Sequence, residues 1–340
     1  MERLHAAATA AEQAVSSGSH PCALIAVGNS ERTVWSHVVS GQNEVAEDSV
    51  FLLASITKTI VATAVMRLVE QGRLLLDVPV VRYIPEFGVN GKEDVTTWHL
   101  LTHTSGLDED NWIEERCRAG TDRLSPVEAA LGSYLHFEPG ERCEYCSLSF
   151  SVLGELIHRL SGQPYPEYLQ QHVFDPLGMP DTAFQPQDQG RALPVHDFGD
   201  ASYLEAFSAL ALPGGGLWST ASDLISFGQA LLRGGELGGY RLLGSAALDT
   251  MVRLHTSGLW ELRAGRRQPF HYGLGWGKPG NAGGLIGSTE AYGHGGATGT
   301  YFWVDPEYDL VCVFLTNRWG LDHEVARRVV NAVYGAVNRT

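Results

Sequence analysis

The chain has 340 residues, of which 44% are hydrophobic and 19% are charged, and its formal net charge is −15. This composition is typical of a folded protein of enzyme size and excludes the disordered and fibrous classes. The negative charge repels phosphate backbones and anionic lipid, so we expect neither a nucleic acid nor a membrane surface as a partner.

The predicted elements begin with an Ala-rich amphipathic helix over residues 3–17. A hairpin of two β-branched runs, 23–27 and 33–39, follows it. From Ser55 the apolar residues recur at helical spacing, and Gly72 is a plausible helix end.

Helical patches and Pro/Gly loops then alternate from residue 73 to about 210, and 148–162 is the clearest of these helices. After a further helix at 219–232, strands are expected at 271–277, 297–305 and 310–317, and residues 323–337 form a closing helix. Strand-rich segments therefore lie at both ends of the chain. We expect an α/β (α+β) sheet domain formed by residues 1–75 and 213–340, with an all-helical domain, 76–212, inserted between them.

Three features of the sequence bear on where in the cell the protein is found. No run of about 18 apolar residues occurs, so no transmembrane helix is expected. Glu12 and Gln13 interrupt the first residues, which lack the apolar centre of a secretory signal. The five cysteines are irregularly spaced and odd in number, which favours free thiols in a reducing compartment. We expect a cytoplasmic protein, unless a leader has been removed.

The string SITK, Ser55 to Lys58, is the most informative short motif. A serine and a lysine three residues apart at the start of a helix lie on one face. Backbone N–H groups at a helix start can stabilise an oxyanion while the serine attacks a carbonyl. A serine is also a common helix cap, and SxxK alone arises often by chance, so the motif needs support from elsewhere.

Two further strings supply that support. Tyr145 lies between the turn EPGER and a predicted helix, and near a lysine its hydroxyl could take the serine's proton. GHGGATG, residues 293–299, precedes an apolar strand, and its glycines allow a ligand to approach the backbone closely beside His294.

Together with their surroundings, these strings resemble the serine β-lactamase and penicillin-recognising family, in its class C-like branch with the family VIII-type esterases. The resemblance spans most of the chain, and its strings follow the order of the family. They are FLLASITK, HLLTHTSGL, FEPGERCEYCSLSFSVLGELIHRLSG, DPLGMPDT, GGGLWSTASDL, YGLGW and YGHGGATGTYFWVDPE. The implied fold is an antiparallel sheet flanked by helices with an inserted helical domain.

The resemblance implies a role for each matching residue. Ser55 matches the nucleophile that forms an acyl-enzyme, Lys58 the lysine that assists it, and Tyr145 the general base. His294 stands where β-lactamases keep the lysine of Lys-Thr-Gly, and is a second candidate for moving the proton.

Gly295 and Gly296 complete that motif and are candidates for contact with substrate. Ala297 matches the residue whose backbone N–H forms the oxyanion hole with the N–H of Ser55.

One position departs from the family pattern. The family's asparagine, which contacts the substrate amide and the catalytic lysine, is here Ser147. A hydroxyl cannot reproduce the donor and acceptor pair of an amide. Because His294 also replaces a constant cation, we expect ester hydrolysis or acyl transfer rather than β-lactam hydrolysis.

Other candidate sites have weaker support. Trp112 and Tyr301 could contact substrate, although the first could lie in a solvated loop and the second could pack the sheet. His99 and His103 are four apart on a predicted helix, which is metal-ligand spacing, but no third ligand is evident, and packing or capping explains them. A second cysteine pair would be needed to make a zinc site of CEYC, Cys143 to Cys146. We expect no metal and no cofactor.

The sequence therefore predicts a serine hydrolase or acyltransferase that acts on a small acyl substrate, an ester, thioester or amide. The alternatives are a D-amino-acid peptidase, amidase or β-lactamase, and a catalytically silent binding protein of the same fold. The acyl substrate, the acceptor and the oligomeric state stay open.

Overall fold

The computed structural model describes residues 4–108, 126–280 and 284–338. A five-stranded antiparallel sheet in the order β2-β1-β11-β10-β9 forms its centre. The strands are β1 (Ala23–Gly28), β2 (Thr33–Val39), β9 (Tyr292–Gly295), β10 (Tyr301–Asp305) and β11 (Leu310–Leu315). Leu24 pairs with Leu315, so the two ends of the chain meet in one sheet.

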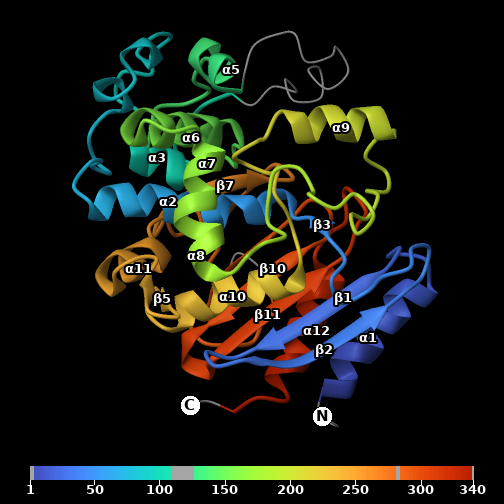
Figure 1. The fold of residues 1–340 in the computed structure, drawn as a ribbon. Coiled ribbons are helices and arrows are strands. Elements are labelled where there is room, and N and C mark those ends of the chain that lie inside the picture. The colour runs from blue at the N-terminus through green and yellow to red at the C-terminus, as the bar shows by residue number, and fades with distance from the viewer. Residues whose placement is uncertain (1–3, 109–125, 281–283, 339–340) are drawn as a thin grey trace.

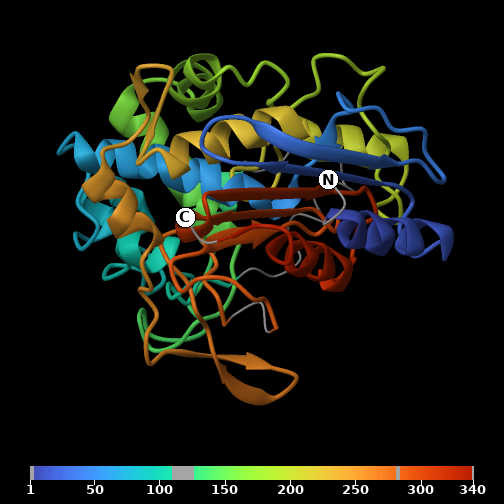
Figure 2. The same cartoon turned by 90° about the horizontal axis from the view of Figure 1, so that it is seen from below.

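Helices cover both faces of this sheet. α1 (His5–Ser16) and α12 (Glu324–Tyr334) lie together on one face, and α10 (Ala221–Leu232) packs against β1, β10 and β11 on the other (Figure 2). Strands β1 and β11 are buried along their whole length because each face is covered. Their continuous apolar runs follow from this position.

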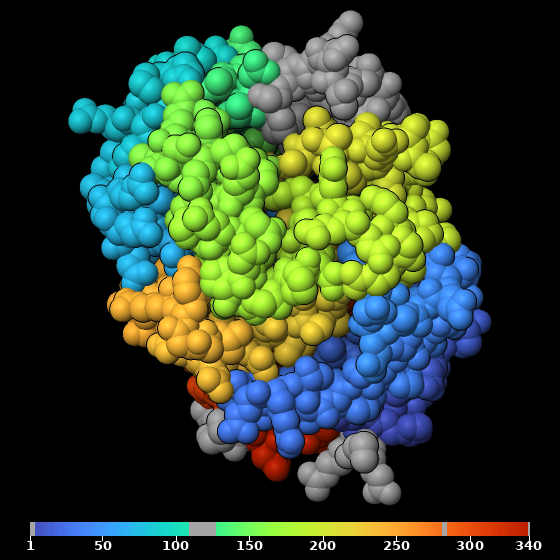
Figure 3. Space-filling model, in the orientation of Figure 1, coloured from blue at the N-terminus to red at the C-terminus, as the bar shows by residue number. Residues whose placement is uncertain are grey.

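The segment between the two sheet-forming parts is mostly helical and lies above the sheet in Figure 1. In Figure 3 it covers the upper part of the face shown. Its helices are α3 (Thr97–Leu101), α5 (Pro126–Gly132), α6 (Leu148–Ser161), α7 (Tyr165–Leu169), α8 (Asp175–Leu177) and α9 (Ala201–Ala209), with a π-helical turn at Gln170–Phe174.

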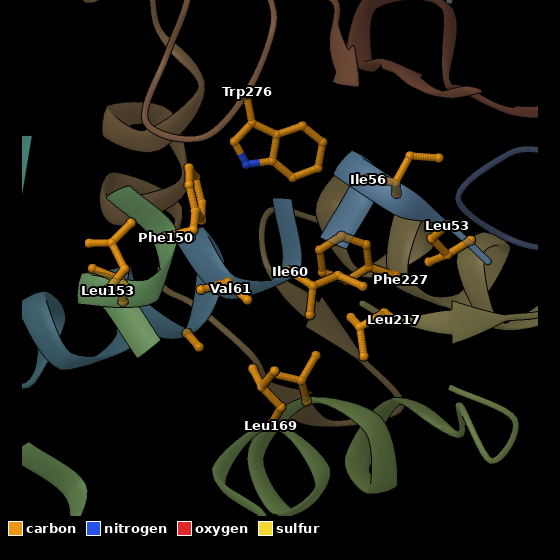
Figure 4. Packing of buried hydrophobic residues seen from close by; sticks show 14 of the residues in the cluster. Leu53, Ile56, Ile60, Val61, Phe150, Leu153, Leu169, Leu217, Phe227 and Trp276 are labelled. Atoms are coloured by element: carbon orange, nitrogen blue, oxygen red, sulfur yellow. The ribbon is translucent and has the colours of Figure 1, made fainter. Parts of the chain in front are cut away.

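Helix α2 (Thr57–Glu70) runs through the centre of the main hydrophobic cluster. Figure 4 shows its Val61 directed toward Phe150 and Leu153 of α6, and its Ile60 toward Phe227 of α10. All of these side chains are fully buried. The site at the start of α2 is therefore carried by a helix that is fixed on several sides.

Smaller elements complete the described part of the chain. They are α11 (Ser245–Val252), the strand pairs β3 (Phe51–Leu52) with β4 (Trp218–Ser219), β5 (Glu236–Leu237) with β6 (Tyr240–Arg241), and β7 (Trp260–Arg263) with β8 (Arg266–Pro269), and 3-10 turns at Ala54–Ile56, Val80–Arg82, Pro85–Phe87 and Pro306–Tyr308. The β7–β8 hairpin projects from the body of the molecule (Figure 2). No helix among the described residues is long and apolar enough to cross a membrane.

Most predicted elements are confirmed, and two are wrong. Residues 271–277 are not a strand, because Gly275 has φ of 80° and the chain turns so that the N–H of Gly273 donates to Trp276 O at 2.7 Å. His99 and His103 do not share a helix, since α3 ends at Leu101 and His103 has φ of 58°. The short strand β9 was not expected.

Candidate active site

Ser55 lies in the 3-10 turn Ala54–Ile56, two residues before α2 begins at Thr57. Ala54 has φ of 48°, a left-handed conformation that costs a non-glycine residue roughly 1–3 kcal/mol and is found most often at functional sites. Leu217 holds the turn, since its carbonyl accepts from Leu53 N at 2.8 Å and its N–H donates to Thr57 Oγ1 at 3.1 Å.

Lys58 is fully buried in the first turn of α2, three residues after Ser55. Its ammonium Nζ donates to Ser55 Oγ at 3.2 Å, to Ser147 Oγ at 3.1 Å and to Gly214 O at 2.6 Å. Three acceptors match the three N–H donors of a charged lysine. Nζ also lies 4.8 Å from the ring centroid of Tyr145, within cation–π range. Lys58 thus joins residues from three separate segments.

Gly214 lies in a tightly packed position. A Cβ on this residue would lie 3.0 Å from the Ser147 carbonyl oxygen and 3.4 Å from Lys58 Nζ. The absence of a side chain lets the backbone carbonyl reach the ammonium directly. Ser147, which replaces the family's asparagine, still accepts a hydrogen bond from Lys58 but provides no amide group to the site.

Tyr145 precedes α6 and is 39% exposed, which leaves part of its ring open to the cavity. On its buried side the ring of His103 lies 4.2 Å away, centroid to centroid. The aromatic contact with His294 is longer, at 6.1 Å. The structure thus brings the tyrosine, the lysine and the serine of the predicted site together.

His294, on β9, is neutral. Burial and the nearby Lys58 charge lower its pKa to about 3. Its Nδ1 lies 2.7 Å from Gly295 O, which can only accept, so Nδ1 carries the proton and Nε2 accepts from the Tyr272 hydroxyl at 2.7 Å. Burial raises the pKa of Tyr272 well above its ordinary value, so this hydroxyl stays a donor. Among the described residues, a neutral imidazole therefore stands at the position of the family's lysine.

The loop after β9 is tied to the backbone that precedes Ser55. Thr298 Oγ1 donates to Leu52 O at 2.9 Å and Thr300 Oγ1 donates to Leu53 O at 3.0 Å. A Cβ on Gly296 would lie 2.2 Å from Leu53 O, so only glycine allows this approach. These contacts hold the backbone of Ala297 and that of Ser55, the two expected oxyanion donors, in a fixed relation.

A cavity of about 330 Å³ opens at this point. Ser55, Tyr145, His294 and Ala297 line it, and so does Tyr301. The further lining residues are Phe270, Tyr272, Gly277, Lys278, Gly293, Gly295, Trp303 and His323. Trp112 lies outside the described residues.

The cysteine and metal alternatives find no support in the described residues. Neither Cys143 nor Cys146 forms a disulfide in the described part of the chain, and both are buried. Burial raises the pKa of Cys143 to about 12, which opposes thiolate chemistry. The residues that the structure describes contain no group of three or more His, Cys, Asp or Glu that could hold a metal ion. His99 caps α3 instead, with Nδ1 accepting from Thr96 N.

Three residues of the site were missed by the sequence reasoning. Gly214, Tyr272 and His103 all lie within strings that carried the resemblance, but no role was assigned to them. Their contacts join segments that are far apart along the chain, which no local pattern reveals.

Residues 7–335 match the family model described as Beta-lactamase. The chain belongs to this family. The family match makes it a serine hydrolase of the beta-lactamase family. Superposition on solved structures shows the beta-lactamase/transpeptidase-like fold.

Relatives within the family are named for different activities. Esterase EstB from Burkholderia gladioli is 41% identical over 170 residues, which is 44% of this chain and 43% of that protein. Penicillin-binding protein 4 from Amycolatopsis lactamdurans is 31% identical over 80% of this chain and 73% of its own length. A solved structure of EstCE1, a hydrolase with promiscuous acyltransferase activity, superposes with a TM-score of 0.80 at 21% identity, covering 98% of this chain and 99% of that one.

Proposed function

We propose that this beta-lactamase family member is an esterase or acyltransferase that works through an acyl-enzyme on Ser55. The observation that carries the proposal is the position of Lys58, whose Nζ contacts Ser55 Oγ and lies over the ring of Tyr145 at the edge of the cavity. The cation thereby contacts both the nucleophile and the ring of the candidate base.

The proposed reaction has two steps. Tyr145 accepts the proton of Ser55 as Ser55 Oγ forms a bond to the acyl carbon, and the backbone N–H groups of Ser55 and Ala297 stabilise the oxyanion. Collapse breaks the bond to the leaving alcohol, which takes the proton from Tyr145. Water or an acceptor alcohol or amine then attacks the acyl-enzyme by the reverse sequence.

In both steps Lys58 favours the ionised form of Tyr145 through its nearby charge. His294 lines the cavity as a neutral imidazole and does not transfer a proton. Both of its ring nitrogens are in hydrogen bonds, and burial lowers its pKa to about 3.

Two features favour an ester over a β-lactam or a peptide. The His294 side chain carries no positive charge for a substrate carboxylate, and Ser147 lacks the amide that would bind a substrate amide. The similarity to esterase EstB supports the same substrate class.

The test compares Ser55→Ala and Tyr145→Phe with wild type on short-chain p-nitrophenyl esters, with mass spectrometry of the acylated protein. Loss of the nucleophile should lower kcat/KM roughly a thousandfold or more, and loss of the base roughly 100-fold or more. Ser149→Ala is the matched control, because this buried hydroxyl contacts Ser105 instead. Unchanged turnover in Ser55→Ala, or an adduct on another residue, would refute the proposal.

A peptidase, amidase or β-lactamase is the second candidate, and the similarity to penicillin-binding protein 4 over 80% of the chain favours it. Nitrocefin and a peptide ending in D-Ala-D-Ala distinguish it from the first. Faster turnover of either substrate than of the esters would replace the esterase assignment. A catalytically silent binding protein would give no labelling of Ser55 by a fluorophosphonate.

A further inference from the structure

His103 is a buried imidazole directly behind Tyr145. It follows α3, has φ of 58° and is fully inaccessible to solvent. It does not line the cavity. Its contacts instead converge on the segment that carries the tyrosine.

Two backbone hydrogen bonds link His103 to the residues on either side of Tyr145. The N–H of Glu144 donates to the His103 carbonyl at 2.9 Å, and the N–H of Cys146 donates to His103 Nδ1 at 3.1 Å. A single residue therefore fixes the backbone before and after the tyrosine. The first of these bonds needs only a backbone carbonyl, whereas the second needs the side chain.

The imidazole also sets the plane of the phenol. Its ring lies 4.2 Å from the Tyr145 ring, tilted by 30°. Tyr272, at 5.0 Å, and Phe150, at 5.7 Å, pack against other sides of the imidazole. Because the imidazole is enclosed, it offers the phenol ring a surface that does not move.

The tautomer of His103 shows that the side chain acts here as a hydrogen-bond acceptor through Nδ1. Since Nδ1 accepts a hydrogen bond, the neutral ring carries its proton on Nε2, and burial keeps the ring neutral by lowering its pKa well below the ordinary value. Nε2 is buried and has no hydrogen-bond partner in the described part of the chain, which is unfavourable for a polar N–H group. A phenyl ring would avoid this cost, but it could not accept from Cys146.

We propose that His103 is a positioning residue for Tyr145, which it holds through the Nδ1 acceptor and the stacked ring. The inference rests on the proposed function, in which Tyr145 moves the proton of Ser55. Proton transfer needs close geometry, and a displacement of about 1 Å can lower a rate roughly 100-fold. His103 thus acts on the reaction through the tyrosine, without touching substrate.

Two substitutions separate the parts of this role. His103→Phe keeps a ring and removes the acceptor, while His103→Asn keeps an acceptor near the position of Nδ1 and tolerates a positive φ. Thr102→Ala is the matched control. It removes a buried hydroxyl from the same turn, and that hydroxyl contacts Trp98 O and Thr104 rather than Tyr145. Each variant is assayed for kcat and KM on a p-nitrophenyl ester, for the rate of fluorophosphonate labelling of Ser55, and for Tm.

We expect His103→Phe to lower kcat and the labelling rate roughly 10- to 100-fold with little change in KM. His103→Asn should recover most of this loss, and Thr102→Ala should keep the kcat of wild type at a comparable fall in Tm. The inference would be overturned if His103→Phe kept the kcat of wild type, or if Thr102→Ala lost as much kcat as His103→Phe. If His103→Phe and His103→Asn lost equal kcat, the role of the Nδ1 acceptor would be overturned. If Tyr145→Phe itself keeps full activity, the proposed function has failed, not this inference alone.

Discussion

Lys58 is the residue on which the other candidate groups converge. Its ammonium is enclosed in the protein interior, where an unpaired charge is strongly unfavourable. The acceptors Ser55, Ser147 and Gly214 offset that desolvation. Ser147 therefore has a function that does not depend on the substrate, since it is one of the groups that hold the Lys58 ammonium in place.

A first prediction concerns that contact. Ser147→Ala should lower kcat/KM roughly tenfold, because losing one hydrogen bond to a buried charged group costs roughly 1–3 kcal/mol and the ammonium can move away from Ser55. Cys146→Ser serves as the control, since it changes the neighbouring side chain and leaves the backbone N–H in place. Steady-state kinetics on a p-nitrophenyl ester would measure the difference, and equal kcat/KM values in the two variants would contradict the role of Ser147.

At the scale of elements, the site depends on how the loop after β9 meets the turn before α2. β9 is the edge strand of the sheet, and the loop that follows it reaches back to the carbonyls of Leu52 and Leu53. Within the loop, Gly296 N donates to Thr300 O at 2.8 Å. The loop is therefore a closed turn attached to its neighbour through threonine hydroxyls rather than through a strand ladder.

Thr300→Val should loosen this attachment. The substitution keeps the branched shape and removes the hydroxyl that donates to Leu53 O, so the backbone of Ala297 loses its fixed relation to Ser55. We expect kcat to fall roughly tenfold and KM to change little, because the oxyanion contact forms mainly in the transition state. Thr300→Ser retains the donor and should stay close to wild type. An unaltered kcat in Thr300→Val would show that the tether is dispensable.

At the scale of the whole molecule, buried histidines make folding sensitive to acid. Burial lowers the pKa of His103, His294 and His323, among others. Between about pH 6.5 and the lowered folded values, the unfolded chain binds protons that the folded chain excludes, so the free energy of unfolding falls as the pH falls. Asp223 acts in the opposite direction, because burial raises its pKa to about 6.

The corresponding prediction is a loss of stability below about pH 6.5. Each such histidine contributes a slope of at most about 1.4 kcal/mol per pH unit. Urea denaturation between pH 7.5 and 4.5 would measure how the free energy of unfolding changes with pH. His294→Gln removes one titrating group, so it should reduce the slope by up to about 1.4 kcal/mol per pH unit. A slope that His294→Gln leaves unchanged would mean that this histidine does not titrate differently in the folded and unfolded chains.

The sequence alone was sufficient to predict the fold class, the helix at 148–162 and the grouping of Ser55, Lys58 and Tyr145. Periodicity and glycine punctuation are local signals, and the motif order reflects the family. The family and fold are confirmed by the comparisons, whereas the catalytic roles and the division into two domains remain predictions.

Only the tertiary structure decided the state of the site. The neutral form of His294 depends on Tyr272 and burial, and the position of Tyr145 depends on His103. The place of the Lys58 ammonium depends on Ser147 and on the carbonyl of Gly214. Each of these contacts joins segments that are distant along the chain. Hydrogen bonding and desolvation act through space, so the same residue letters could have given a charged histidine or a mobile tyrosine in another packing.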